Sequence, residues 1–249
     1  MSLQLAKNPH HLVLIPGLDG TGMLFEPFVQ ALPPGIDASI VSFPHDKASY
    51  DHDLFAVIRN VIPWNRPLVI LAESSSGPLG MRFAAAQREN VHAVILVSSF
   101  VSNPIVAASN WSTTFLSKPW YEKPPTAVSV RKHLLGKNAS DMMVNKTVNA
   151  LRTPWPAVLG HRIELMKKID AREALKNWDK PVLYIRAEND QFVSKSSTEE
   201  VCRLNHRVRM VSVPGPHLLL QSNPQGALEA ILPFLQSLSG ESRATTEAA

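Results

Sequence analysis

Six short runs of apolar, often β-branched residues recur along this chain. They are HLVLIP (11–16), ASIVSF (38–43), LVILA (68–72), AVILV (93–97), VLYIR (182–186) and VRMVSV (208–213). Continuous apolar runs of this length are typical of strands that are buried on both faces. Helical patterns such as MLFEPFVQAL, HDLFAVIRNVI and GMRFAAAQREN separate the first four runs. The alternation predicts an α/β fold with a mostly parallel sheet of about six strands flanked by helices.

The regular spacing of the predicted strands fails once, between the fourth run and the fifth. Residues 98–181 separate these two runs, which is too long for one crossover helix. The stretch contains helix-like pieces such as VRKHLLGKN and GHRIELMKKIDAREALKNW. We therefore expect one domain with a core of residues 1–99 and 171–239 and a helical cap of residues 100–170 inserted after the fourth strand. The polar tail 240–249 has no periodicity and is expected to be disordered.

Composition and charge narrow the classes of function. The chain is 45% hydrophobic with a formal net charge of +4, and it has no basic run that would indicate nucleic-acid binding. The amino-terminal MSLQLAKNPHH lacks the apolar stretch of a secretion signal, and no uncharged stretch approaches the roughly 20 apolar residues that span a bilayer. We therefore expect a cytoplasmic protein without a membrane span.

The stretch LVILAESSSG (68–77) places three consecutive serines where a predicted strand turns into a helix. A nucleophile in such a turn needs small residues two positions before and two after it, because strand and helix approach closely there. Ser74 has Ala72 and Ser76 at these positions, whereas Ser75 has a glutamate and Ser76 has a proline at one of them. Ser74 is therefore the candidate nucleophile. The alternative is that the serines only cap the following helix.

Three other stretches place polar groups at the ends of predicted strands. LVLIPGLDGTG (12–22) enters a Gly-rich loop, which either forms a plain turn or aims a backbone N–H at a developing oxyanion. PVLYIRAENDQFV carries Asp190 in an acidic loop, and VPGPHLLLQSNP carries His217 before an apolar helix. A serine, an acid and a histidine thus follow three predicted strands in the order Ser74, Asp190, His217. That is the chain order of an α/β-hydrolase triad.

The stretches LIPGLDGTG, LAESSSG, RAENDQFV and GPHLLLQ together resemble the α/β-hydrolase superfamily over about residues 11–237. They are most similar to small bacterial carboxylesterases and thioesterases that have a PGLDGTG loop and an ESxSG elbow. The resemblance implies Ser74 as the nucleophile, Asp190 as the orienting acid and His217 as the base.

The resemblance also implies that the backbone N–H groups of Leu18 and Ser75 form the oxyanion hole. Two features depart from the superfamily. Pro16 and Gly17 stand where a His-Gly pair is usual, and the first two strands of the superfamily are missing.

These residues predict ester hydrolysis through an acyl-enzyme, with no metal or organic cofactor. The histidines and aspartates of PHDKASYDHD (44–53) do not have the spacing of a tetrahedral metal site, and we interpret them as a solvated loop. Two alternatives remain open. An acyltransferase would use the same residues with an alcohol in place of water, and a non-catalytic ligand-binding protein can have the same fold.

The predicted cap contains large apolar residues that suit an acyl pocket. The candidates are Trp111, Phe115, Met142 and Trp155. The same residues would also serve to pack the cap onto the core, so the pattern alone does not assign them to substrate binding.

The predicted cap also concentrates positive charge. Residues 103–169 contain ten Lys and Arg against three acids, a balance of +7, whereas the whole chain carries +4. A solvated helical face is one explanation. The other is a face that attracts an anionic partner, such as an acyl ester on an acidic carrier protein, rather than a neutral small-molecule ester. Two pairs are candidates for that face, Arg131 with Lys132 and Lys167 with Lys168.

Overall fold

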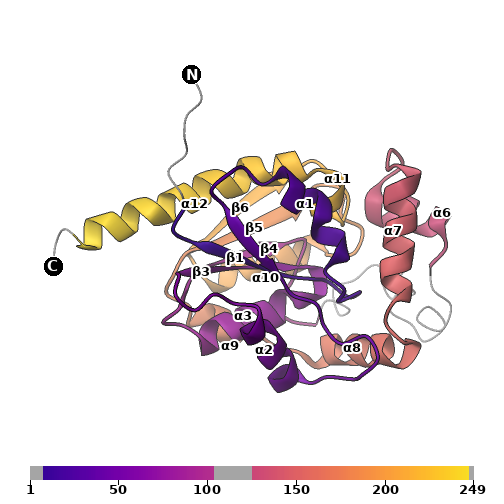
Figure 1. Cartoon of the computed structure of the whole chain (residues 1–249), viewed down its shortest axis with the longest axis horizontal. Helices are drawn as coiled ribbons and strands as arrows, with labels where there is room; N and C mark the ends of the chain where they lie inside the picture. The colour runs from indigo at the N-terminus through magenta and orange to yellow at the C-terminus, as the bar shows by residue number, and fades with distance from the viewer. Residues whose placement is uncertain (1–7, 104–124, 247–249) are drawn as a thin grey trace.

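The computed structural model describes residues 8–103 and 125–246 and contains one sheet of six strands (Figure 1). All neighbouring strands are parallel and their order is β2-β1-β3-β4-β5-β6. The strands are β1 (His11–Ile15), β2 (Asp37–Ile40), β3 (Leu68–Glu73), β4 (Val91–Val97), β5 (Val182–Ala187) and β6 (Val208–Val213). Each corresponds to one of the six apolar runs, so the predicted α/β fold is confirmed.

Helices cover both faces of the sheet. One face packs against α1 (Glu26–Ala31), α11 (Leu219–Ser222) and α12 (Pro224–Thr246), and the other against α2 (Asp51–Asn60), α3 (Gly77–Ala86), α9 (Arg172–Lys176) and α10 (Lys195–Leu204). Successive side chains of a strand point to opposite faces, so Leu71 enters the first of these cores and Ile70 the second. Both faces of the four inner strands are therefore buried, which explains why these strands appear as continuous apolar runs, whereas the edge strands β2 and β6 are partly exposed.

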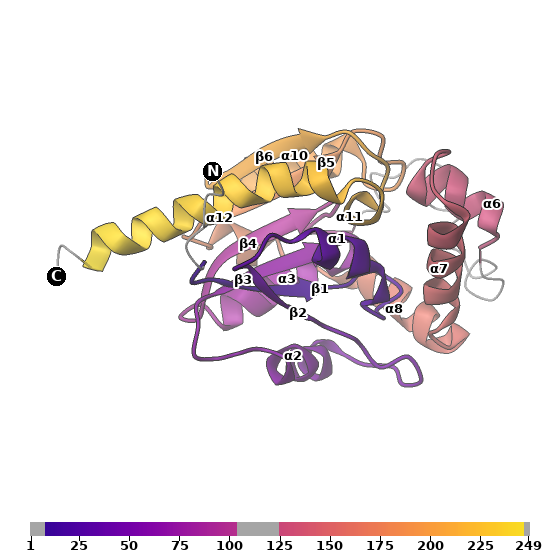
Figure 2. The same ribbon diagram turned by 45° about the horizontal axis from the view of Figure 1, so that its top comes forward.

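The chain leaves the sheet after β4 and returns at β5, as the spacing predicted. The described part of this insertion holds α6 (Ala127–Val130), a short π-helix η4 (Arg131–Leu135), α7 (Asp141–Arg152) and α8 (Pro156–Lys168). The strand arrows point toward α6 and α7, so the insertion lies beyond the carboxyl edge of the sheet (Figure 2). Residues 104–124 lie outside the described part of the chain, and the exact limits 100–170 stay a prediction.

The cap has a small hydrophobic core of its own. Val130, Val144 and Val148 pack there. Two residues of the main domain join them: Leu24 from the 3-10 turn η1 (Met23–Phe25) and Leu218. The cap is thus docked onto the loops that follow β1 and β6.

The helix α12 runs through Thr246, whereas we predicted a disordered tail over residues 240–249. That prediction is wrong for residues 240–246. Glu241, Arg243 and Ala244 favour helix, and adding residues to an existing helix is easier than starting a new one, so the loss of apolar periodicity does not end α12. Within the described ranges no helix is long and apolar enough to cross a membrane.

Candidate active site

Ser74 lies at the sharp turn between β3 and α3, as the first residue of the 3-10 turn η2 (Ser74–Ser76). Its φ is +53°, a left-handed conformation that a residue with a Cβ adopts at a cost in free energy. The turn is tight because α3 touches β3. A Cβ added to Gly80 would come 2.7 Å from the Cβ of Ala72. The small residue that we expected two positions before Ser74 is therefore required by this contact.

Two serines support the turn from behind. Ser76 is buried and donates its hydroxyl to the carbonyl of Pro16, which ties the turn to the loop after β1. Ser99, just after β4, donates to the carbonyl of Ser74 at 2.6 Å. Ser76 occupies the N-cap position of α3, yet its side chain makes no capping hydrogen bond. The alternative interpretation of these serines as helix caps is therefore not supported.

The structure brings Ser74, His217 and Asp190 into one series of hydrogen bonds. Ser74 Oγ lies 2.8 Å from His217 Nε2. On the other side of the ring, His217 Nδ1 lies 2.9 Å from each carboxylate oxygen of Asp190. The three residues come from the ends of β3, β6 and β5, which meet at the carboxyl edge of the sheet.

Two backbone hydrogen bonds fix the position of the Asp190 side chain. Its Oδ1 accepts the backbone N–H groups of Phe192 at 2.7 Å and Val193 at 3.0 Å. Burial of His217 disfavours the charged imidazolium, but the charge and hydrogen bond of Asp190 outweigh this, so the pKa of His217 lies above its ordinary value of 6.5. The carboxylate therefore orients the ring and makes Nε2 a stronger base.

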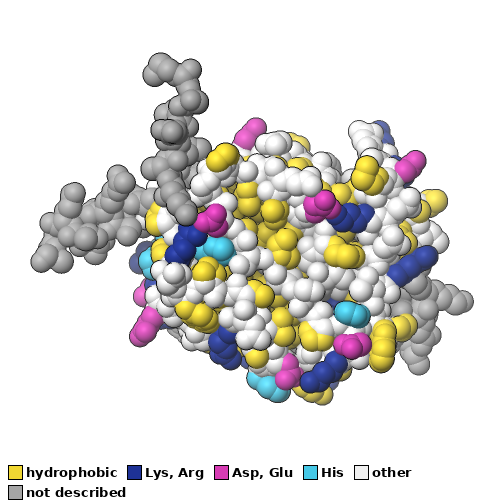
Figure 3. Space-filling model, in the orientation of Figure 1, with side chains coloured by type: hydrophobic (Ala, Val, Ile, Leu, Met, Phe, Trp, Pro, Cys, Tyr) yellow, Lys and Arg dark blue, Asp and Glu magenta, His cyan; other side chains and the backbone are white. Residues whose placement is uncertain are grey.

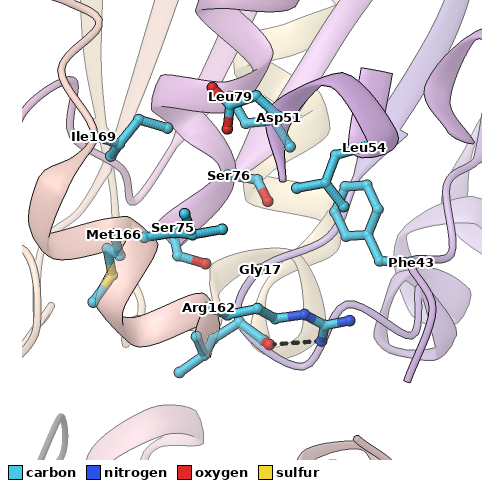
Figure 4. Close-up of a pocket in the computed structure, with 12 residues that line it drawn as sticks. Gly17, Phe43, Asp51, Leu54, Ser75, Ser76, Leu79, Arg162, Met166 and Ile169 are labelled. Atoms are coloured by element: carbon cyan, nitrogen blue, oxygen red, sulfur yellow. Dashed lines mark hydrogen bonds between the residues drawn. The ribbon is translucent and has the colours of Figure 1, made fainter. Parts of the chain in front are cut away.

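The Gly-rich loop after β1 lies against the nucleophile candidate. A Cβ on Gly17 would come 3.4 Å from the Cβ of Ser74. Leu18 and Ser75, the residues expected to supply the oxyanion donors, line one small pocket of about 50 Å³ beside this contact (Figure 4). The apolar lining of that pocket comes from the core, from α8 and from the residue that follows α8: Phe43, Leu54, Leu79, Leu165, Met166 and Ile169.

Two of the four large apolar residues that we predicted for the substrate pocket have largely exposed side chains. Met142 is 80% exposed and Trp155 is 59% exposed, while Trp111 and Phe115 lie outside the described residues. The reason is helical geometry: α7 turns Val144 and Val148 toward the cap core and leaves Met142 on its outer side. Met142 and Trp155 do not line the pocket beside Ser75, and their contact with a substrate stays a prediction.

The positive charge of the cap is partly neutralised within the fold. Arg131 pairs with Asp141, and Lys167 pairs with Glu164 at 2.7 Å, whereas Lys132 and Lys168 are exposed. On the face that Figure 3 shows, Lys and Arg side chains are interspersed with Asp and Glu rather than gathered into one patch. The expected anionic-partner face thus rests mainly on Lys132 and Lys168.

Side chains of the acidic and histidine-rich stretch 44–53 pair with protein groups. Asp51 begins α2 and pairs with Arg82, and His52 lies 3.2 Å from Asp53. Among the described residues, no group of three His, Cys, Asp or Glu side chains is placed to hold a metal ion.

Sequence reasoning missed two residues of this site. In the sequence, Glu73 only argues against Ser75 as the nucleophile, yet its side chain is buried beside the site and hydrogen-bonded to Gln221. In the sequence, Arg162 is one of ten cations of the cap, yet it lines the pocket with Leu18 and Ser75. The position of Glu73 next to Ser74 was an available signal, whereas nothing in the sequence distinguished Arg162 from the other cations of the cap.

The chain is similar in sequence to one known protein that we compared. No protein-family model matches the chain. The chain is 24% identical over 245 residues to the biotin biosynthesis bifunctional protein BioHC of Cellvibrio japonicus, a match that covers 92% of the chain and 48% of that protein. The chain therefore spans about half the length of this curated relative.

Solved structures give a closer match in shape than in sequence. The chain superposes on a bromoperoxidase from Bacillus anthracis with a TM-score of 0.78 at 17% identity, over 91% of this chain and 92% of that one. It superposes on a thermophilic esterase from Thermogutta terrifontis with a TM-score of 0.72 at 15% identity, over 92% of this chain and 90% of that one. The chain thus has the α/β-hydrolase fold.

Proposed function

We propose that this protein is a serine hydrolase that cleaves carboxylic esters or thioesters through an acyl-enzyme intermediate. The observation that carries the proposal is the series of hydrogen bonds from Ser74 to His217 to Asp190 at a left-handed turn. Such a series lets a serine hydroxyl lose its proton as its oxygen attacks a carbonyl carbon. Similarity to an esterase in fold supports a hydrolase but does not choose its substrate.

Acylation follows from the geometry. His217 Nε2 takes the hydroxyl proton as Ser74 Oγ bonds to the substrate carbonyl carbon, and Asp190 stabilises the imidazolium that forms. The carbonyl oxygen becomes negative and accepts hydrogen bonds from the backbone N–H groups of Leu18 and Ser75. In comparable sites each such hydrogen bond stabilises the transition state by about 3 kcal/mol. The tetrahedral intermediate collapses, and His217 returns the proton to the departing alcohol or thiol.

Deacylation repeats these steps with water. His217 removes a proton from a water molecule as its oxygen attacks the acyl carbon, and the proton then passes to Ser74 Oγ as the acid leaves. The reaction consumes one water and releases one carboxylic acid. None of these steps requires a metal or a redox cofactor.

The pocket beside Ser75 favours short acyl chains. Its apolar lining suits a hydrocarbon group, and its volume of about 50 Å³ leaves little room. The substrate is therefore a short acyl ester, either a small molecule or an acyl group on a carrier. The exposed Lys132 and Lys168 are the features that favour an acidic carrier protein.

A fluorophosphonate probe tests the proposal. We expect the wild-type protein to be labelled at one serine, and Ser74→Ala to lose both the label and the hydrolysis of a p-nitrophenyl ester. Ser75→Ala is the matched control, because it keeps the backbone N–H and should retain measurable activity. Labelling of the Ser74→Ala protein would refute Ser74 as the nucleophile. No labelling of folded wild type would refute the proposal and favour a ligand-binding protein.

Product analysis separates hydrolysis from acyl transfer. With an added alcohol acceptor, a hydrolase releases mainly the free acid, whereas an acyltransferase forms the new ester. A dominant ester product would replace the hydrolase by the acyltransferase alternative and keep the roles of the three residues.

A further inference from the structure

The cap helix α8 is hydrogen-bonded to two loops of the main domain. At its start, the backbone N–H of Trp155 donates to the carbonyl of His45 at 2.8 Å. Six residues further on, the ring of His161 lies 3.2 Å from the carbonyl of Ser49. Arg162, the next residue, turns toward the loop after β1 that contains Gly17 (Figure 4). The cap and the loop beside Ser74 are therefore directly connected.

The guanidinium of Arg162 holds three backbone carbonyls. Its Nη1 donates to Leu18 at 3.1 Å, the bond drawn in Figure 4, and to Asp19 at 2.6 Å. Its Nη2 donates to Pro44 at 2.7 Å. Backbone carbonyls removed from water require partners, and a planar guanidinium with five N–H groups can serve several at once. A single cap residue thus links two loops of the main domain.

The loop is shaped to receive this side chain. Gly20 has a φ of +68°, and a Cβ at that position would lie 2.4 Å from Nη1 of Arg162. The guanidinium therefore occupies the space beside Gly20 that any other residue would fill. Phe43 closes the same unit by donating its backbone N–H to the Gly20 carbonyl at 2.7 Å.

We infer that Arg162 is a positioning residue that holds the oxyanion loop in its working conformation. The inference rests on the proposed function, in which the N–H of Leu18 is an oxyanion donor. The same residue gives its carbonyl to Arg162. Anchoring that carbonyl and the next one restricts rotation of the backbone about Leu18, and so fixes the direction of its N–H. The cap is then part of the catalytic apparatus as well as a cover for the pocket.

The test compares Arg162→Gln with Arg131→Gln, using a small neutral ester. Arg131 is the matched control because its guanidinium bonds Asp141 and the carbonyl of Ala139 within the cap. We expect Arg162→Gln to lower kcat by about tenfold or more, short of the roughly 10²–10³-fold loss on removing an oxyanion donor. KM should change little, and Arg131→Gln should retain wild-type kcat.

A transition-state analogue distinguishes positioning from general damage. Ser74 Oγ attacks the carbonyl carbon of a trifluoromethyl ketone, and the carbonyl oxygen becomes an oxyanion in the oxyanion hole. The matching methyl ketone binds without forming this bond. We expect Arg162→Gln to weaken binding of the trifluoromethyl ketone by the same factor as it lowers kcat/KM. Binding of the methyl ketone should not change. Unchanged kcat, or a loss of kcat/KM without weaker binding of the trifluoromethyl ketone, would overturn the inference.

A second variant approaches the contact from the other side. Gly20→Ala should displace the guanidinium and lower kcat, but should add little to the loss in Arg162→Gln because both remove the same contact. If the fold-loss of kcat in the double variant equals the product of the two single losses, the inference is overturned. If Arg162→Gln does not fold, Arg162→Lys carries the same comparison, since one ammonium cannot span three carbonyls.

Failure of this inference can be distinguished from failure of the proposed function. If wild type is not labelled by the fluorophosphonate, the proposed function fails. If wild type is labelled and hydrolyses the ester while Arg162→Gln matches it in kcat and in analogue binding, only the role of Arg162 fails.

Discussion

Glu73 is buried directly before Ser74 and accepts a hydrogen bond from the amide of Gln221 at 3.2 Å. Burial raises the pKa of this carboxyl group from 4.5 to about 7, against the smaller opposing effects of Gln221 and His217. In the unfolded chain Glu73 ionises near its ordinary pKa. Between about pH 4.5 and 7 the folded protein therefore binds more protons, and this group lowers stability as the pH rises.

Glu73→Gln should remove this loss of stability. We expect the free energy of unfolding of the variant, relative to wild type, to rise between pH 5 and pH 8 by up to about 3 kcal/mol. Urea unfolding at the two pH values measures it, with Glu229→Gln on the exposed side of α12 as the control. An equal difference between variant and wild type at both pH values would contradict the expected titration of Glu73.

The activity of the protein should fall at acid pH as His217 becomes protonated. Because Asp190 raises the pKa of His217 against the effect of burial, the midpoint of the acid limb of kcat/KM should lie above 6.5. Ionised Glu73 also raises that pKa, so Glu73→Gln should shift the limb to lower pH. A profile that is flat from pH 5 to pH 9 would count against a histidine base.

Asp190→Asn should lower kcat strongly with little change in KM. The amide cannot stabilise the imidazolium and favours the wrong tautomer of His217, and in comparable sites such a change costs about 10⁴-fold. Steady-state kinetics with a p-nitrophenyl ester measures the effect. A folded Asp190→Asn protein with near wild-type kcat would show that another group orients the histidine.

The length of the acyl chain should be limited by the pocket behind Ser75. Met166→Ala removes part of the wall that α8 contributes (Figure 4), and should shift the preference from short esters toward longer ones. The comparison is the ratio of kcat/KM for hexanoate and acetate esters. Met142→Ala is the control, since this exposed residue does not line the pocket. The assignment fails if only Met142→Ala alters the ratio.

An anionic acyl carrier should react faster at low salt. The attraction between an acidic carrier and Lys132 or Lys168 is screened by ions, whereas cleavage of a neutral ester should respond little. Charge reversal of Lys132 together with Lys168 should lower kcat/KM for the carrier substrate and leave a neutral ester unchanged. If neither salt nor the reversals affect the carrier substrate, the cap charge serves only solubility.

The sheet and the sharp turn at Ser74 could be predicted because each depends on local sequence. A strand buried on both faces must be apolar along its length, and a strained turn needs a small neighbour such as Ala72. The ends of the strands could be predicted less well than their positions. β4 begins at Val91 rather than Ala93, because the half-buried His92 interrupts the apolar run without ending the strand.

The cap could be located from the sequence, but the roles of its residues could not. Met142 and Trp155 have the right chemistry for a pocket and point elsewhere, because orientation depends on how each helix packs. Arg162 has the same side chain as Arg131, and only the tertiary fold places one against three loop carbonyls and the other against Asp141. Long-range contacts of this kind leave no periodic signal.

The insertion between β4 and β5 has a consequence for how the chain reaches its fold. These strands are hydrogen-bonded neighbours, yet residues 98–181 must be looped out before they pair. Because the entropy of closing a loop grows only with the logarithm of its length, this loop costs about 1.4 kcal/mol more than the 74–90 crossover between β3 and β4. Such a small penalty leaves the insertion free to vary in length. We expect its main effect to be kinetic, because folding slows as the sequence separation of contacting residues grows.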